Sequence, residues 1–342
     1  MRSRLKVIRL RGISFRANLW VLTLVCASLA VALLLSAWAL TLGSFSLPIR
    51  EVVRALIGSG SDQARFIVMD LRLPRIMAAV LIGAMLSMSG AIFQGVVRNP
   101  LVAPDMIGIN AGASLSAVIW IVGEHPSELL PIAAFAGALM AAGAIYLLTW
   151  RGNIAGARLI LVGIGVNAML GAATTILLVR SEIHDASRIV LWMTGSVYGS
   201  DWNDVRVLAF ALAVLAPVGV VLMWYLRVLQ LGDLTAGSLG MPVERVRLAL
   251  IIVGCGLSGV AVSIAGPIGF VALMVPHVAR MLAGPMTSGV FVLTALLGSI
   301  LLLGSDMIGQ HALPVGLPAG VITAALGAPY FLFLLYRTQT RV

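Results

Sequence analysis

Ten runs of apolar residues divide this chain of 342 residues. Most are about as long as the roughly 20 residues that an α-helix needs to cross a bilayer, and each is bounded by Gly, Pro or charge. The runs lie at about 19–42, 74–97, 101–122, 129–150, 157–179, 205–226, 248–265, 268–283, 289–308 and 313–336. Since 60% of the residues are hydrophobic and only 11% charged, a soluble domain of this length is excluded. The sequence predicts an all-α, polytopic membrane protein with about ten transmembrane helices, in which residues 1–342 form a single transmembrane domain.

The distribution of Lys and Arg predicts which side the termini occupy. An even number of spans places both termini on one side, and with that side inside, 15 of the 23 Lys and Arg are cytoplasmic, against three of the 13 acids. Such an excess of cations marks the cytoplasmic side, so we expect N-in and C-in, with a basic cytoplasmic N-terminus at 1–18. The net charge of +10, which in a soluble protein suggests nucleic acid, is here mostly a topology signal. The inner cations are Arg2, Arg4, Lys6, Arg9, Arg11, Arg16, Arg98, Arg151, Arg158, Arg227, Arg245, Arg247, Arg280, Arg337 and Arg341.

The first apolar run comes after a basic segment, as the apolar part of a signal peptide does. It is longer than the ~7–15 apolar residues of such a peptide and no small-x-small cleavage site follows it, so we expect a retained first span.

The chain lacks the residues that several kinds of enzyme and metal site require. The single lysine, Lys6, has no glycine beside it, so the chain cannot form a Walker A loop for ATP. Cys26 and Cys255 lie far apart, and the four histidines have no metal-ligand spacing and form no arguable Ser/His/Asp arrangement. We therefore expect no enzyme activity, no metal site and no cofactor in this chain.

No span carries the central Asp, Glu or His chain that a proton-coupled carrier requires. Arg158, Arg280 and Asp306 all fall near span ends. This weighs against an ion-coupled secondary transporter, although sodium coordinated by backbone carbonyls would leave no such trace.

Three connections are long enough to display function: 43–73 and 180–204 outside, and 227–247 inside. The first predicts a short amphipathic helix around 51–56, and the second a short helix in the headgroup region. The third predicts a cytoplasmic helix that Asp233 caps at its N-terminus and Gly240 ends in the left-handed conformation.

Polar residues at the two membrane faces have alternative readings. Arg72 and Arg75 begin the second span on the outer side, either as a fork for carboxylates of a docking protein or as interfacial anchors. His277 and Arg280 share a helix face near the cytoplasm, where capping, anchoring and partner contact are all open. The inner turn at 98–105, which has two prolines, is either a gate or a connector.

Ordered motifs along nearly the whole chain resemble the FecCD-type permeases of bacterial ATP-binding-cassette (ABC) importers for ferric siderophores, haem and vitamin B12. The motifs are Leu71-Arg72-Leu73-Pro74-Arg75, Ser89-Gly90-Ala91-Ile92-Phe93-Gln94, Arg98-Asn99-Pro100-Leu101, Leu231-Gly232-Asp233, Ala265-Gly266-Pro267-Ile268-Gly269-Phe270, Pro276-His277-x-x-Arg280, Leu313-Pro314-Val315-Gly316 and Leu326-Gly327-Ala328-Pro329. Within the family, segments 150–152, 158–166 and 243–248 look most like the subunits for ferric enterobactin.

The resemblance implies a type II ABC importer permease in the bacterial plasma (inner) membrane. It implies a second permease subunit, either a paralogue or a second copy, and two copies of an ABC ATPase that binds ATP and magnesium. It also implies an extracytoplasmic siderophore-binding protein. The implied cargo is a ferric siderophore, of catecholate, enterobactin-like type; a vitamin B12 or haem permease is the alternative within the family.

The resemblance also assigns roles to residues of this sequence. Arg72 and Arg75 match the arginines that receive glutamates of the binding protein, while Gln310 replaces a third arginine often found in the family. Asn99 and Leu101 match the cytoplasmic gate. Residues within 227–247 match the segment that couples to the ATPase, with Arg245 and Arg247 as rim contacts of that interface; its other members are Leu231, Gly232, Asp233, Leu239 and Gly240.

Overall fold

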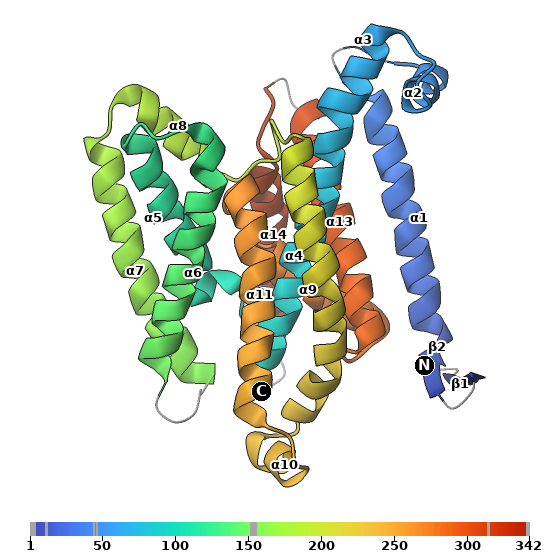
Figure 1. Ribbon diagram of the computed structural model, residues 1–342. Coiled ribbons are helices and arrows are strands. Elements are labelled where there is room, and N and C mark those ends of the chain that lie inside the picture. The colour runs from blue at the N-terminus through green and yellow to red at the C-terminus, as the bar shows by residue number, and fades with distance from the viewer. Residues whose placement is uncertain are drawn as a thin grey trace.

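The ten apolar runs are ten helices in the computed structural model, which describes residues 5–10, 13–43, 45, 47–150, 156–312 and 315–339 (Figure 1). Seven of the helices in this part of the chain are long and apolar enough to cross a membrane, while α5, α12 and the apolar stretch Ala319–Leu334 of α14 are shorter. The ten helices are α1 (Leu19–Thr41), α4 (Leu73–Val97), α5 (Ile109–Val122), α6 (Leu130–Thr149), α7 (Gly156–Arg180), α9 (Trp202–Leu229), α11 (Val243–Ala265), α12 (Val271–Ala283), α13 (Ser288–His311) and α14 (Ala319–Gln339).

Some residues used in the sequence argument lie outside the described part of the chain. They are Arg2, Arg4, Arg11, Arg151, Leu313, Pro314 and Arg341.

Helices α5, α12 and α14 begin later than the apolar pattern predicts. The runs expected from 101, 268 and 313 become helical only at Ile109, Val271 and Ala319. Gly108 (φ 78°) and Phe270 (φ 66°) take left-handed conformations that interrupt a helix. Apolar residues ahead of the helices, such as Val102 and Ile268, are buried in irregular segments. Such backbone is tolerated at membrane depth where protein surrounds it, and hydropathy alone does not reveal it.

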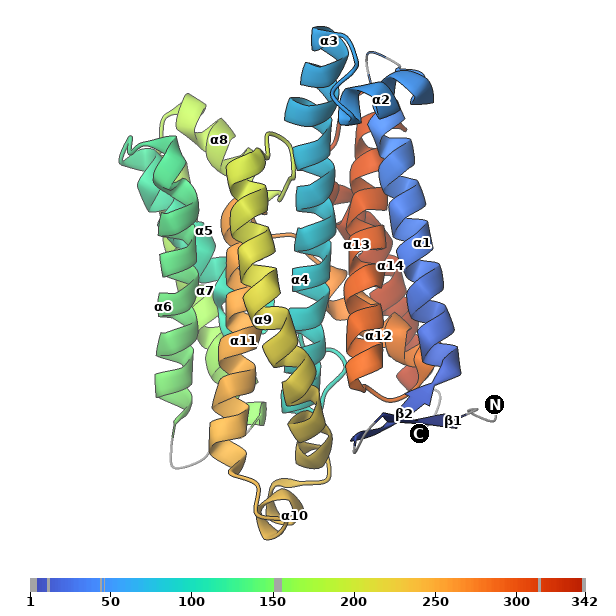
Figure 2. The same cartoon turned by 45° about the vertical axis from the view of Figure 1, so that its right-hand side comes forward.

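Helix α4 is the centre of the fold. It packs against α9, α11, α12 and α13, and most of its residues are buried (Figure 2). Two glycines permit this packing, because a Cβ on Gly83 would collide with the Gly298 carbonyl and one on Gly90 with the Ala272 carbonyl. Backbones approach closely at such small residues in membrane helix bundles.

Serine hydroxyls add hydrogen bonds between α4 and its neighbours. Ser87 Oγ donates to Thr294 O (3.0 Å), and Ser89 Oγ donates to Gly254 O (2.7 Å). Because lipid offers no competing partner, these bonds hold the bundle together around α4.

The N-terminal end of α4 continues into a longer projection. A short helix α3 (Asp62–Arg65) and a π-helical turn η1 (Phe66–Arg72) run directly into α4, giving 36 helical residues from Asp62 to Val97. At ~1.5 Å per residue this is about 54 Å, well beyond the ~30 Å hydrocarbon core. The top of this helix therefore stands clear of the bundle in Figure 1, beside α2 (Ile49–Leu56).

Short helices occupy the three predicted connections. Helices α2 and α8 (Ile183–Met193) lie at one end of the bundle, and α10 (Asp233–Ser238) lies at the opposite end (Figure 2). Helix α1 begins and α14 ends at the α10 end, as an even number of spans requires. With the charge distribution, this makes the α10 end cytoplasmic.

Four further short elements complete the described chain. The 3₁₀ turns η2 (Pro104–Ile107) and η3 (Ser127–Leu129) precede α5 and α6. Strands β1 (Leu5–Leu10) and β2 (Ile13–Asn18) form an antiparallel hairpin ahead of α1, which the all-α prediction did not anticipate. In β2 apolar and polar residues alternate, a pattern typical of a strand.

Candidate docking, gate and coupling sites

Arg72 caps the end of α1. Its guanidinium donates to the Leu40 carbonyl (Nη1–O, 2.7 Å) and to the Phe45 carbonyl (Nη2–O, 2.6 Å). Gly43 makes room for it, since its φ is +144° and a Cβ there would lie 2.5 Å from Nη2 of Arg72. A cation at the C-terminal carbonyls of a helix is favourable, so Arg72 joins the outer ends of α1 and α4.

The π-helical segment η1 ends at this arginine. The Leu73 N–H bonds to the Val68 carbonyl, five residues back, just before Pro74, which has no N–H to give. π-helical backbone is rare and occurs frequently at functional sites.

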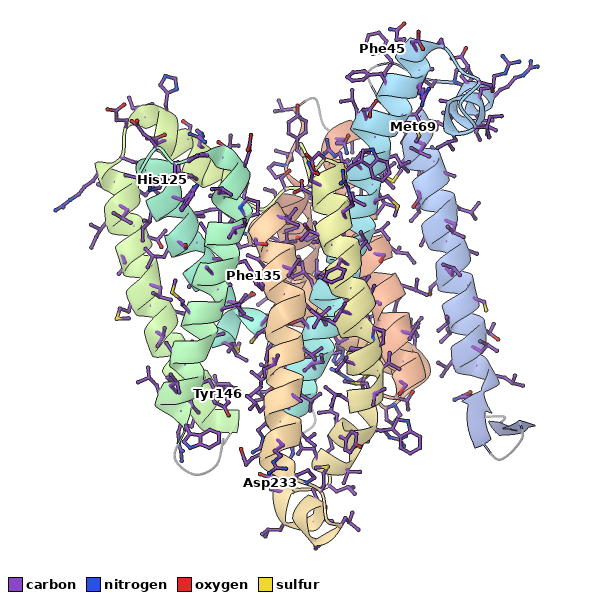
Figure 3. The ribbon with its side chains drawn as sticks, viewed as in Figure 1. Phe45, Met69, His125, Phe135, Tyr146 and Asp233 are labelled. Carbon is purple, nitrogen blue, oxygen red and sulfur yellow. The ribbon has the colours of Figure 1, made fainter. Side chains whose placement is uncertain are left out.

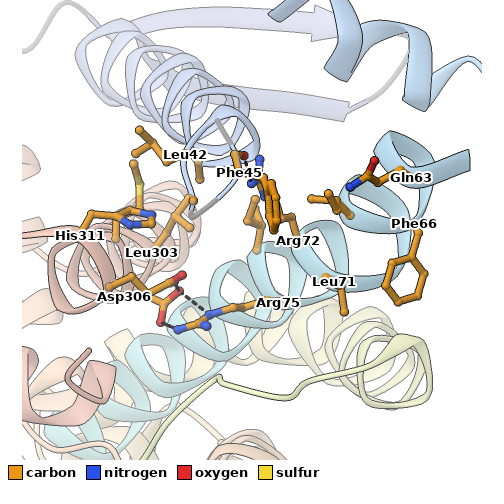
Figure 4. Close-up of a pocket in the computed structure, with 16 residues that line it drawn as sticks. Leu42, Phe45, Gln63, Phe66, Leu71, Arg72, Arg75, Leu303, Asp306 and His311 are labelled. Carbon is orange, nitrogen blue, oxygen red and sulfur yellow. Dashed lines mark hydrogen bonds and ion pairs between the residues drawn. The ribbon is translucent and has the colours of Figure 1, made fainter. Parts of the chain in front are cut away.

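Arg75 forms a two-point ion pair with Asp306 of α13 (Figure 4). Nε lies 3.0 Å from Oδ2 and Nη2 lies 2.7 Å from Oδ1, and the Asp306 side chain is only 2% exposed. Gln310 Nε2 also donates to Oδ2 of Asp306 (2.5 Å), and the Tyr198 ring lies 5.2 Å from the guanidinium of Arg75. Sequence reasoning placed Asp306 at a span end and missed this role, although a buried acid at that depth implied a partner.

A cavity of about 480 Å³ opens beside these residues, between the end of α1, the top of α4 and the end of α13 (Figure 4). Arg72, Arg75, Gln63, Asp306, Gln310 and His311 supply its polar lining. The structure thus brings both predicted docking arginines to one hollow at the outer end, while each already bonds within the chain. Docking of a partner here stays a prediction.

The predicted gate turn follows α4 directly. Arg98 ends the helix in the left-handed conformation (φ 58°), and Asn99 Oδ1 accepts the Leu101 N–H (2.9 Å). The side-chain bond of Asn99 fixes a tight local turn. Asn99 and Leu101 are partly buried at the α10 end of α4.

The far end of this turn is fastened to α5 and α7. Asn110 Nδ2 donates to Oδ1 of Asp105 (2.6 Å), and Asn167 Nδ2 donates to the Asp105 carbonyl (2.7 Å). A Cβ on Gly163 would collide with the Met106 carbonyl, so α7 lies directly against η2. The segment from Arg98 to Gly108 therefore follows α4 and is bonded to α5 and α7. Its role as a gate stays a prediction.

The coupling segment forms helix α10, with one correction to its predicted cap. The N-cap position is Gly232 (φ 110°) and makes no side-chain cap bond, while Asp233 is the first helical residue. Asp233 instead accepts hydrogen bonds from Arg98 (Nη2–Oδ1, 2.5 Å) and Arg247 (Nη2–Oδ2, 2.8 Å). Each of these bonds joins two opposite charges, whereas a cap bond would join the carboxylate to a neutral backbone N–H. Gly240 has the predicted left-handed conformation (φ 80°).

Apolar side chains face outward around α10. Leu231, Leu234 and Leu239 are 64%, 93% and 66% exposed. Figure 3 shows Asp233 at this tip, at the opposite end of the molecule from Phe45.

The two arginines predicted as rim contacts differ in exposure. Arg245 is exposed, whereas the Arg247 side chain is 5% exposed and pairs with Glu244 (2.6 Å) and Asp233. A rim contact is therefore a prediction for Arg245 alone, because Arg247 is occupied inside the chain.

His277 and Arg280 of α12 turn toward neighbouring helices. Arg280 Nη2 donates to Gln94 Oε1 (2.6 Å), and Gln94 Nε2 donates to the Leu273 carbonyl (3.0 Å). The His277 ring meets the Tyr330 ring edge-on, with 6.2 Å between the centroids. These contacts join α12 to α4 and α14, and a partner at this face stays a prediction.

Comparison with known proteins decides the family. Residues 20–337 match the profile described as the FecCD transport family. The chain belongs to the FecCD transport family. The FecCD match covers all ten apolar helices, so the bundle and both of its faces are features of one transport permease rather than of an enzyme.

Individual FecCD relatives span nearly the whole chain. The achromobactin transport system permease protein CbrC of Dickeya dadantii is 41% identical over 331 residues, covering 94% of this chain and 90% of the relative. The ferric enterobactin permease FepG of Escherichia coli is 38% identical over 306 residues, covering 89% and 92%. Relatives 34–40% identical carry names for ferric citrate, ferric hydroxamate and cobalamin import.

A solved structure has the same fold. An inward-facing structure of a metal-chelate type ABC transporter matches with a TM-score of 0.84 at 26% identity, covering 92% of this chain and 99% of the other. This FecCD chain is thus a multi-span inner-membrane permease of an ABC importer of the siderophore, iron and vitamin B12 group.

Proposed function

We propose that this chain is the permease subunit that moves a ferric siderophore of catecholate, enterobactin-like type across the bacterial inner membrane. The observation that carries the proposal is the FecCD match over residues 20–337, with the 38% identity to the ferric enterobactin permease supporting the choice of cargo. The 41% identity to an achromobactin permease makes that siderophore the first alternative cargo, and cobalamin the next.

The energy for transport enters through α10. Three leucines exposed at a helical tip form an apolar surface of the kind that marks a protein contact. The partner we propose is a pair of ABC ATPase subunits, which bind ATP and magnesium, so that this chain itself performs no covalent chemistry.

The opposite end receives the cargo. Arg72 and Arg75 lie beside one outer cavity, and a siderophore-binding protein that presents carboxylates would meet their guanidinium groups there. A second permease subunit, a paralogue or a second copy, completes the transport pathway.

The cargo is tested with the complete importer in proteoliposomes and its siderophore-binding protein. We expect the binding protein to hold ferric enterobactin more tightly than ferric achromobactin or cyanocobalamin, and uptake of that chelate to require ATP. Tightest binding of achromobactin or cobalamin would contradict the catecholate assignment. Uptake that continues without ATP and follows an ion gradient would instead favour an ion-coupled secondary transporter.

A further inference from the structure

Asp233 is held by arginines from two different helices. Arg98 Nη2 lies 2.5 Å from Oδ1, and Arg247 Nη2 lies 2.8 Å from Oδ2. Arg98 is the residue between α4 and the turn at Asn99 and Leu101, and Arg247 lies in α11. One carboxylate therefore joins the first turn of α10 to the ends of two membrane helices.

The geometry of Arg98 serves this contact. Arg98 adopts a left-handed conformation that residues other than glycine rarely take. In this conformation its guanidinium reaches both Asp233 and the Leu229 carbonyl at the end of α9 (2.6 Å). The end of α4, the end of α9 and the start of α10 thus meet at one side chain.

Arg247 anchors the other carboxylate oxygen from inside the protein. Its side chain is 5% exposed, and its two acidic partners are Asp233 and Glu244. A cation that is nearly buried requires such partners, so α10 is fastened to a fixed point of the bundle.

The Asp233 carboxylate and its two arginine partners are charged throughout the physiological pH range. Partial burial acts to raise the pKa of Asp233, but hydrogen bonds and charge from Arg247 and Arg98 outweigh it and hold that pKa below its ordinary value. The carboxylate therefore stays ionised at neutral pH, and both ion pairs keep their charges.

We propose that Asp233 is a positioning residue that transmits displacement of α10 to the turn at Asn99 and Leu101 through Arg98, with Arg247 as the fixed point. The inference rests on the proposed function, because it needs α10 to be the element that the ATPase moves. The Arg98–Asp233 contact, rather than the fold of α10 alone, then couples ATP hydrolysis to movement of the turn at Asn99 and Leu101. The test therefore measures coupling itself.

The experiment uses the complete importer in proteoliposomes and measures chelate uptake per ATP hydrolysed. We expect Asp233→Asn and Arg98→Gln each to lower this ratio by about fivefold or more. Asp233→Glu retains the charge and is expected to keep the ratio within about twofold of wild type.

Glu244→Gln is the matched control. It removes one acidic partner of Arg247, as Asp233→Asn does, but it leaves the Arg98 contact intact. We expect its ratio to stay within about twofold of wild type. We also expect the double variant Arg98→Gln/Asp233→Asn to be no worse than Asp233→Asn alone, because that substitution already removes the Arg98 ion pair.

An unchanged ratio in Asp233→Asn, or equal losses in Asp233→Asn and Glu244→Gln, would overturn the inference. Should Asp233→Asn fail to assemble with the ATPase, Arg98→Gln decides alone, since it leaves the sequence of α10 intact, and an unchanged ratio again overturns the inference. A wild-type importer without ATP-dependent uptake would instead contradict the proposed function, so the two failures are distinguishable.

Discussion

Arg75 and Asp306 stand 231 positions apart in the sequence and meet through two hydrogen bonds at the outer ends of α4 and α13. The pair explains how two residues that are costly in a membrane are accommodated there, since each supplies the charge that the other needs. It also fixes the position of an arginine that borders the outer cavity.

Asp306→Asn is expected to destabilise the protein by about 2–4 kcal/mol, because it leaves a largely buried arginine without its counter-charge. Thermal unfolding in detergent measures the effect. Asp185→Asn is the control: it removes a partly buried carboxylate 3.8 Å from the exposed Arg188, and we expect a change of about 0.5 kcal/mol or less. Equal melting temperatures for the two variants would show that the Arg75–Asp306 pair contributes little.

Charge reversal separates docking from anchoring at the outer face. We expect Arg75→Glu to weaken binding of the siderophore-binding protein by about tenfold or more, the loss of one favourable charge pair. Asp306→Asn, which breaks the same ion pair but leaves Arg75 positive, should retain binding. Arg54→Glu, on the exposed face of α2, controls for general charge effects. If Arg75→Glu and Arg54→Glu bind equally well, Arg75 is an anchor and the docking assignment fails.

The contact between α4 and α12 predicts an intolerant glycine. Gly90→Ala is expected to lower the melting temperature and to reduce uptake, because its Cβ would collide with the Ala272 carbonyl. Gly143→Ala, in the exposed part of α6 with nothing within 4 Å of its Cβ, should leave the melting temperature unchanged or slightly raise it. A harmless Gly90→Ala variant would contradict the close packing of these helices.

The tip at α10 predicts an uncoupled variant. Leu239→Glu places a charge on an exposed apolar residue, so insertion and folding should persist while ATPase binding falls by about tenfold or more. Replacing Gly232 (φ 110°) by a bulky charged residue should uncouple hydrolysis from uptake by straining the start of α10. Wild-type uptake in both variants would remove α10 from the coupling interface.

Much of this architecture was predictable because the signals are local. Apolar runs predict the ten helices, and the coupling helix follows from a polar interval that ends in Gly240. The late starts of α5 and α12 were not predictable from hydropathy, since buried apolar residues such as Val102 and Ile268 lie in the irregular segments ahead of these helices. The late start of α14 was missed because exposed Val315 and partly buried Leu317 extend the apolar pattern ahead of that helix. A β-hairpin at the N-terminus was also missed, because its two strands are short and lie in a basic segment.

The partners of the charged residues could not be predicted. Pairing of Arg75 with Asp306, and of Asp233 with Arg98, depends on which helices become neighbours, and sequence spacing carries no such information across 231 or 135 positions. The prediction that Asp233 caps the helix was wrong for this reason, because its carboxylate accepts hydrogen bonds from Arg98 and Arg247 instead.

Uptake of ferric enterobactin by the complete importer in proteoliposomes, with ATP or with a non-hydrolysable analogue enclosed, tests the central claim most directly. We expect accumulation with ATP, none with the analogue, and loss of accumulation in the Leu239→Glu importer although the purified ATPase subunits still hydrolyse ATP. Equal uptake under both nucleotides, or full uptake by the Leu239→Glu importer, would contradict it.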